Sequence, residues 1–145
     1  MSSTARLRLT PPEPSETELH EAVVQAIDLL VLPPAMVNCF PAGHIPLPPA
    51  AAAALFRAGL KRGWPDLLVI HDARVFGIEL KKPGCGLSKT RTVRSKRTGA
   101  LRLVEGQADV HPRLEAAGMT IGLARSVDEV LALLRGWGVP LRRYG

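Results

Sequence analysis

Two apolar runs lie almost end to end in the middle of the sequence, within WPDLLVIHDARVFGIELKK. Only Asp72-Ala73-Arg74 separates them, and two short apolar runs with such a break are typical of a β-hairpin. Side chains alternate along a strand, so Phe76, Ile78 and Leu80 should face one side while Glu79 and Lys81 share the other. The sequence therefore predicts an acid and a base held together on one face of a sheet.

The segments around this hairpin predict helices that flank a small sheet. Ser15 followed by Glu18 is a capping-box pattern, and the helix that it opens carries an apolar stripe at helical spacing down to Pro33-Pro34. An edge strand is expected over 36–40, and a helix from Pro48 or Pro49 to Gly63. A further helix is expected over 107–117, where Pro112 either weakens that prediction or marks the first turn. A buried strand at MTIGLA and a helix from Ser126 to about Gly136 complete the order. This order predicts an α/β fold with a small mixed sheet flanked by helices.

The length of 145 residues suits one compact domain, expected over 15–145 with a basic insertion at 88–104. The polar, proline-rich start, residues 1–14, is expected to be a flexible arm. Neither a run of about 20 apolar residues nor a signal-peptide stretch is found, which predicts no membrane partner. We expect a location in the cytoplasm of a bacterial or phage-infected cell, which the presence of only two cysteines, with nothing to mark them as a pair, also favours.

An excess of basic residues favours a polyanionic partner. The chain has 19 Lys and Arg against 13 Asp and Glu, for a net charge of +6. The segment SKTRTVRSKRTGALR holds no acid, and it is expected to be a mobile loop or a protruding hairpin that contacts phosphates; a solvated loop is the alternative. Its candidate nucleic-acid-binding residues are Lys89, Arg91, Arg94, Lys96, Arg97 and Arg102.

Alone, Glu79 and Lys81 are a weak signal, because alternating charges are common on exposed strand faces. Asp66 strengthens it, since hairpin pairing should bring the start of the first strand near Glu79. Carboxylates gathered in this way are ligands for Mg²⁺ or Mn²⁺, beside which Lys81 would steady an attacking water. Glu16 lies in line with the buried helical stripe and is our predicted third carboxylate; the alternative is a favourable acid in the first turn of a helix.

A helix with a glutamate, followed by GLKRGWPDLLVI and VFGIELKKPG, resembles the virus-type replication-repair nuclease (VRR-NUC) branch of the PD-(D/E)XK superfamily, from about Glu16 to Val130. The resemblance implies a restriction-endonuclease-like core and a Mg²⁺- or Mn²⁺-dependent phosphodiesterase acting on DNA. Asp66, Glu79 and the Leu80 carbonyl would be metal ligands and Lys81 would be catalytic. Gln107 is similar in position to a glutamine that family members carry on the helix after this strand, and the resemblance implies that it belongs to the catalytic residues.

Small stand-alone members of that branch are associated with dimers and with branched DNA such as Holliday junctions. Two departures are FPAG in place of Pro-Asn-Gly, and the basic segment that lengthens the path to Gln107. We therefore predict a homodimeric, metal-dependent DNA endonuclease selective for junctions or flaps in replication, repair or recombination. The alternatives are a non-catalytic nucleic-acid-binding module on the same fold and a basic protein that bridges DNA without a metal site.

Overall fold

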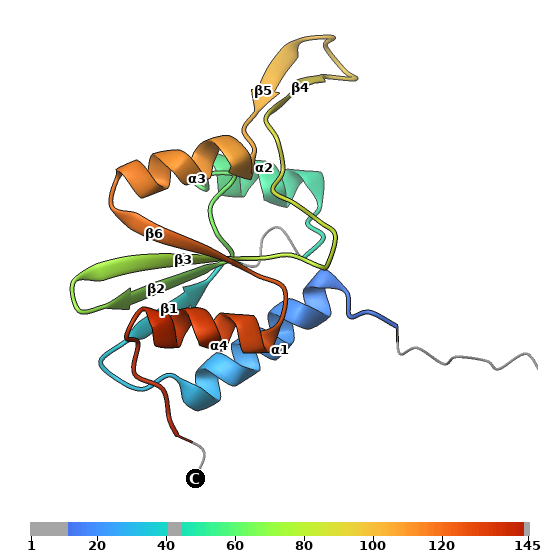
Figure 1. Ribbon diagram of the computed structural model, residues 1–145. Coiled ribbons are helices and arrows are strands. Elements are labelled where there is room, and N and C mark those ends of the chain that lie inside the picture. Colours follow the sequence, from blue (N-terminus) through green and yellow to red (C-terminus); the bar gives the residue numbers. More distant parts are fainter. Residues whose placement is uncertain (1–11, 41–44, 144–145) are drawn as a thin grey trace, which may run out of the picture.

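The computed structural model describes residues 12–40 and 45–143, which form a small sheet between two layers of helices (Figure 1). The sheet has the order β1-β2-β3-β6. Its strands are β1 (Met36–Cys39), β2 (Leu67–His71), β3 (Arg74–Leu80) and β6 (Met119–Ala124). The pairs β1–β2 and β2–β3 are antiparallel, whereas β3 and β6 are parallel. The predicted α/β class with a small mixed sheet and flanking helices is confirmed.

Two helices cover one face of the sheet and bury most of the core. These two helices are α1 (Glu16–Leu30) and α4 (Val127–Gly136). The opposite side of the sheet carries α3 (Gln107–Ala116) together with α2 (Pro49–Arg57) (Figure 1). The apolar stripe of α1 packs against the alternate apolar residues of β2 and β3, and the ring of Trp137 stacks on Phe76 with centroids 4.7 Å apart. The other face of β3 is thereby turned toward α3.

The predicted helix starts are confirmed at both capping sites. The Ser15 hydroxyl accepts from the Glu18 backbone while the Glu18 carboxylate accepts from the Ser15 backbone, and the Ser126 hydroxyl accepts from the Glu129 backbone. Pro112 was expected to weaken its helix or to lie in the first turn, but it lies in the interior of α3. The helix continues past it because packing of α3 on β6 stabilises the turn that lacks one donor.

The second helix is shorter than predicted, ending at Arg57 instead of near Gly63. Gly59 adopts a φ of +110°, and its N–H donates to the Phe56 carbonyl while the Leu60 N–H donates to the Leu55 carbonyl. These two bonds make a Schellman motif, which terminates a helix at a glycine. The residues after Gly59 therefore form a turn instead of a further helical turn.

The two hairpins have different roles. Asp72 and Ala73, both with positive φ, make a two-residue turn between β2 and β3, with His71 paired to Arg74. The basic segment forms a separate hairpin of β4 (Arg91–Arg94) and β5 (Leu101–Val104), which protrudes from the domain (Figure 1). The segment was expected to be a mobile loop or a protruding hairpin, and the structure shows the protruding hairpin.

The strand at MTIGLA is less buried than predicted. β6 lies at an edge of the sheet and the helices cover it only in part, so Thr120 and Leu123 are exposed while Met119 and Ala124 are buried. Of the expected N-terminal arm, residues 1–11 lie outside the described residues and 12–14 are exposed without regular structure. Most of FPAG, residues 41–43, also lies outside them. Within 12–40 and 45–143, no helix is both long and apolar enough to cross a membrane.

Candidate active site

The β2–β3 hairpin brings two carboxylates to the same end of the sheet. Leu67 pairs with Ile78, so Asp66, just before β2, lies beside Glu79 of β3. The Asp66 Oδ2 atom accepts a hydrogen bond of 2.8 Å from the Leu80 backbone N–H, which fixes the carboxylate against the end of β3. Both acids are buried, Asp66 at 8% exposure and Glu79 at 1%. The predicted convergence of Asp66 and Glu79 is confirmed.

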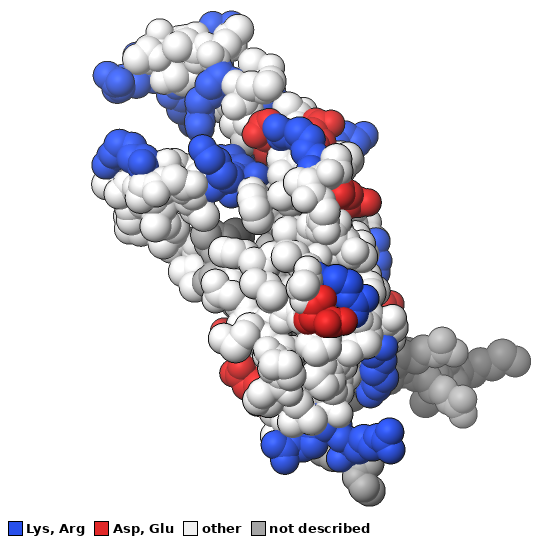
Figure 2. Space-filling view, turned by 90° about the vertical axis from the view of Figure 1, so that its left-hand side faces the viewer, with Lys and Arg blue, Asp and Glu red and all other residues white. Residues whose placement is uncertain are grey.

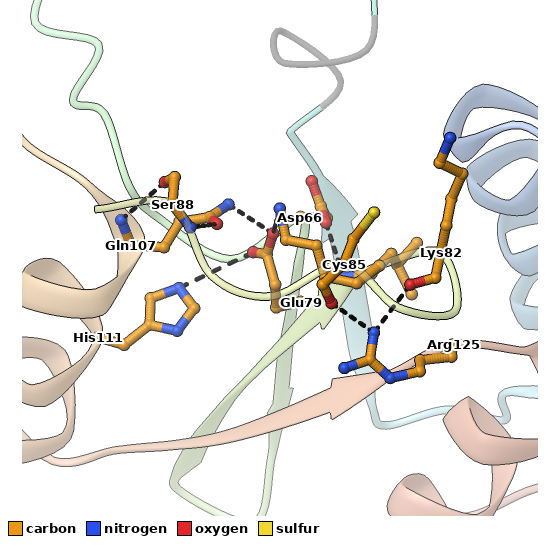
Figure 3. Close-up of polar contacts among 10 residues, drawn as sticks. Asp66, Glu79, Lys82, Cys85, Ser88, Gln107, His111 and Arg125 are labelled. Carbon is orange, nitrogen blue, oxygen red and sulfur yellow. Dashed lines mark hydrogen bonds and ion pairs between the residues drawn. The ribbon is translucent and has the colours of Figure 1, made fainter. Parts of the chain in front are cut away.

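Glu79 also contacts the other two residues predicted to be catalytic, and its contact with Gln107 is drawn in Figure 3. The Lys81 Nζ atom lies 3.3 Å from Glu79 Oε1, and the Gln107 Nε2 atom donates to the same oxygen at 2.5 Å. Gln107 comes from the first turn of α3, which lies on the Glu79 face of the sheet. Asp66, Glu79, Lys81 and Gln107 therefore form one cluster, of which the sequence predicted the first three and the resemblance added Gln107.

Gln107 is itself held in place by the segment that leads into the basic hairpin. Its side-chain carbonyl accepts from the Ser88 N–H at 3.0 Å, and its own N–H donates to the Ser88 hydroxyl at 3.1 Å. The Cβ of any side chain at Gly106 would lie 2.5 Å from the Ser88 carbonyl oxygen, so only glycine allows this close approach. The base of the hairpin is thus fastened to the start of α3.

The environment of Glu79 strongly disfavours its charged form. Burial raises the pKa of Glu79 to about 8, the neighbouring Asp66 charge adds to the rise, and Lys81 and Gln107 oppose it. The Glu79 Oε2 atom is buried and has no hydrogen-bond partner among the described residues. A buried carboxylate oxygen is stabilised by a donor or by a cation, so these two acids fit a divalent metal ion well.

Glu16 does not join this cluster. It is half-buried in the first turn of α1, and within the described ranges no three His, Cys, Asp or Glu side chains are placed to hold a metal together. Glu16 instead matches the alternative interpretation, that of a favourable acid in the first turn of a helix. Mg²⁺ usually keeps several waters and takes only one or two carboxylates, so Asp66 and Glu79 suffice for such a site.

His111 is a neighbour of the site that the sequence did not single out. It is buried at 4% exposure, forms a hydrogen bond with the Gly63 backbone, and places Nε2 3.8 Å from Glu79 Oε2. Burial is the main cause that lowers its pKa, which favours the neutral ring. Its spacing of four residues from Gln107 puts both side chains on one face of α3, and that spacing was the available signal.

Arg125 supports the loop that follows Lys81 (Figure 3). Its Nη1 atom donates to the Lys82 carbonyl at 2.9 Å and to the Cys85 carbonyl at 2.6 Å. The parallel pairing of β3 with β6 places Leu80 opposite Ala124, and this brings Arg125 next to a segment about 40 residues earlier in the chain. Sequence reasoning missed Arg125 because that contact depends on the parallel register.

A cleft of about 600 Å³ opens beside the carboxylates, between the turn after α2 and the base of the basic hairpin. Asp66 and Gln107 line it at the site, and the cations on its walls are Lys61, Arg62, Lys89 and Arg91. Lys and Arg side chains gather in the upper part of Figure 2, at the level of the hairpin and α2, where the surface is hollowed. Lys61 and Arg62 were not predicted to belong to such a surface, and Trp64 was expected to pack in the core, with a contact to the sugar-phosphate backbone as the alternative.

The six predicted nucleic-acid-binding residues divide between different faces of the hairpin. Arg91 pairs with Val104 and both line the cleft, and strand alternation puts Arg102 on that same face. Arg94 lies on the opposite face, where it donates to the Gly99 carbonyl. Lys89 lies at the base beside the cleft, and Lys96 and Arg97 lie in the exposed turn.

No family model, curated protein or solved structure matches this chain. The resemblance to VRR-NUC nucleases therefore rests on the sequence motifs alone.

Proposed function

We propose that this chain is a metal-dependent DNA endonuclease of the PD-(D/E)XK type that hydrolyses phosphodiester bonds. The observation that carries the proposal is the buried Glu79 carboxylate, placed beside Asp66 and 3.3 Å from the Lys81 ammonium, with one oxygen that no donor of the described residues satisfies. Burying two adjacent acids is costly unless a cation neutralises them. A purely structural role would be served by apolar side chains at lower cost.

Asp66 and Glu79 would hold Mg²⁺ or Mn²⁺, with the Leu80 carbonyl as the ligand that the resemblance adds. When bound, such a cation polarises a phosphate and lowers the pKa of an attacking water. Lys81 lies on the same strand face, where its ammonium orients the water and stabilises charge that develops on the phosphate. Gln107 is a positioning residue, because its hydrogen bond fixes the direction of the Glu79 carboxylate.

The surroundings of the acids favour a nucleic-acid substrate. The cleft that reaches Asp66 carries four cations on its walls, and the hairpin above it adds the exposed Lys96, Arg97 and Arg102. Phosphate contacts of this kind depend on salt and carry no sequence information. We therefore propose selectivity for DNA shape, with junctions or flaps as substrates in replication, repair or recombination and with a homodimer as the active form.

A cleavage assay tests the proposal. Labelled four-way junction, flap and plain duplex are incubated with the protein in Mg²⁺, Mn²⁺ or EDTA, next to Asp66→Asn, Glu79→Gln and Lys81→Met. We expect cleavage by the unmodified protein in either metal, faster on the branched substrates, and a loss of at least about 100-fold in each variant. The matched control is Asp128→Asn, which neutralises an exposed acid on α4 and should cleave normally.

Two results would count against the proposal. Cleavage that persists in EDTA or in the three site variants would exclude the metal site at Asp66 and Glu79 and the catalytic role of Lys81. Binding of DNA by the unmodified protein without cleavage in either metal would favour the non-catalytic binding module. Urea unfolding of each variant separates loss of chemistry from loss of the fold.

A further inference from the structure

Trp64 is placed differently from the other tryptophan of the chain. Trp137 is partly buried and stacks on Phe76, whereas Trp64 is 40% exposed and lines the cleft, two residues before Asp66. Its neighbour Pro65 is fully buried against Gly77, where an added Cβ would lie 2.6 Å from Pro65 Cγ. The indole is therefore held in position by a tightly packed backbone although much of its own surface is open.

A second flat group stands on the wall of the same cleft. The Arg62 guanidinium lies over the Phe56 ring, 4.3 Å from its centroid, and both residues line the cleft. A guanidinium that stacks on an aromatic ring keeps its orientation, and its outer face remains available to a planar partner. Trp64 and the Arg62–Phe56 pair thus offer two planar surfaces close to the carboxylates.

The charge of the cleft suits a phosphate backbone. Lys61, Lys89 and Arg91 line it together with Arg62. Glu105 also lines it, but its carboxylate is engaged by the Arg113 guanidinium at 2.5 Å and so offsets little of that charge. Planar apolar surfaces combined with cations are the features by which proteins hold single-stranded nucleic acid.

We infer that this cleft is a binding site for an unpaired DNA strand, with Trp64 as the base-stacking platform next to the scissile phosphate. The inference rests on the proposed function and specifies its substrate. Bases inside a duplex are already stacked on one another, so an aromatic face in a cleft is accessible only to a base that has left the duplex. The strand that enters is then the displaced arm of a flap or the opened centre of a junction.

Equilibrium binding in EDTA tests the inference without cleavage. The probes are a fluorescein-labelled oligothymidylate and a blunt duplex of equal length, titrated against the unmodified protein, Trp64→Ala, Trp64→Phe and Leu29→Ala. Leu29 is a matched control because it is a large apolar residue, 56% exposed, on α1. Since base stacking contributes about 1 to 3 kcal/mol, we expect Trp64→Ala to weaken oligothymidylate binding by about 5- to 150-fold.

The same variants give two further expected results. Trp64→Phe should keep most of the affinity, and Trp64→Ala should weaken duplex binding much less than oligothymidylate binding. Oligothymidylate should also quench tryptophan fluorescence in the unmodified protein and not in Trp64→Phe, since Trp137, the other tryptophan, is partly buried, packs against the core and does not line the cleft. Unchanged oligothymidylate affinity in Trp64→Ala, or an equal loss for both probes, would overturn the inference.

Failure of this inference differs from failure of the proposed function. Metal-dependent cleavage with no dependence of strand binding on Trp64 would refute the stacking platform and leave the nuclease intact. Stacking on Trp64 without cleavage in any metal would refute the nuclease and leave the stacking platform intact.

Discussion

Replacing Glu79 with glutamine should change how the stability of the metal-free protein depends on pH. The pKa of Glu79 is raised from 4.5 to about 8, mainly by burial, so the folded protein retains a proton that the unfolded chain releases. Between these two values the folded state binds more protons, and its free energy of unfolding must fall as the pH rises. Above about pH 8 the loss is complete, because Glu79 is then ionised in both states.

The size of the effect follows from the interval between the two pKa values. Each pH unit within it lowers the free energy of unfolding by about 1.4 kcal/mol, so the fall from about pH 6 to about pH 8 is roughly 2 kcal/mol. Glutamine has the same shape and does not titrate, and it keeps an oxygen that can accept from Gln107. The lowered pKa of His111 makes the free energy of unfolding rise with pH, but only below its ordinary pKa of 6.5. Both the unmodified protein and Glu79→Gln contain His111, so this contribution cancels in their comparison.

Urea unfolding in EDTA at about pH 6 and about pH 8 measures the difference. We expect the unmodified protein to lose roughly 2 kcal/mol more than Glu79→Gln over this range, and Mg²⁺ or Mn²⁺ at about pH 8 to restore stability only where Glu79 is present. Parallel pH profiles for the two proteins would refute the reasoning that burial holds Glu79 in its protonated form.

One substitution that removes a glycine and one that introduces a glycine test the local packing and the backbone conformation. Gly106→Ala should lower the free energy of unfolding by about 2 kcal/mol and detach the basic hairpin, because the new methyl group meets the Ser88 carbonyl oxygen at 2.5 Å; Gly86→Ala, with nothing within 4 Å, is the neutral control. Ala73→Gly should raise the melting temperature by about 2 to 4 °C, since the positive φ of 57° costs alanine about 1 kcal/mol. Ala100→Gly in the other hairpin should give no such gain, and urea or thermal unfolding measures all four variants.

The sequence predicted the cluster of acids because local rules determine it. A hairpin with a short turn has a fixed register, and alternation then places Glu79 and Lys81 on one face with Asp66 beside them. The resemblance added Gln107, which the structure places on the same carboxylate. These features depend on residues close in sequence, or on a motif that already contains the long-range pairing.

The cleft walls were not predictable in the same way. The exposure of Trp64 and Arg62 depends on the early end of α2 at Gly59, where helix propensity alone favoured a longer helix. Glu16 was misplaced for a related reason, since a position in line with an apolar stripe fixes a direction and not a distance from β3. Such distances are set by how helices pack on the sheet, and no local pattern encodes them.

The first turn of α3 joins the site to both walls of the cleft. Gly63 approaches α3 so closely that an added Cβ would lie 2.6 Å from Val110 Cγ2, and Gly106 approaches the Ser88 backbone from the other side. Between these two contacts, Gln107 holds the Glu79 carboxylate. A strand that displaced either wall would therefore shift the start of α3 and, through Gln107, the orientation of Glu79. In the nuclease that we propose, substrate entry and alignment of the catalytic carboxylate are mechanically linked at this turn.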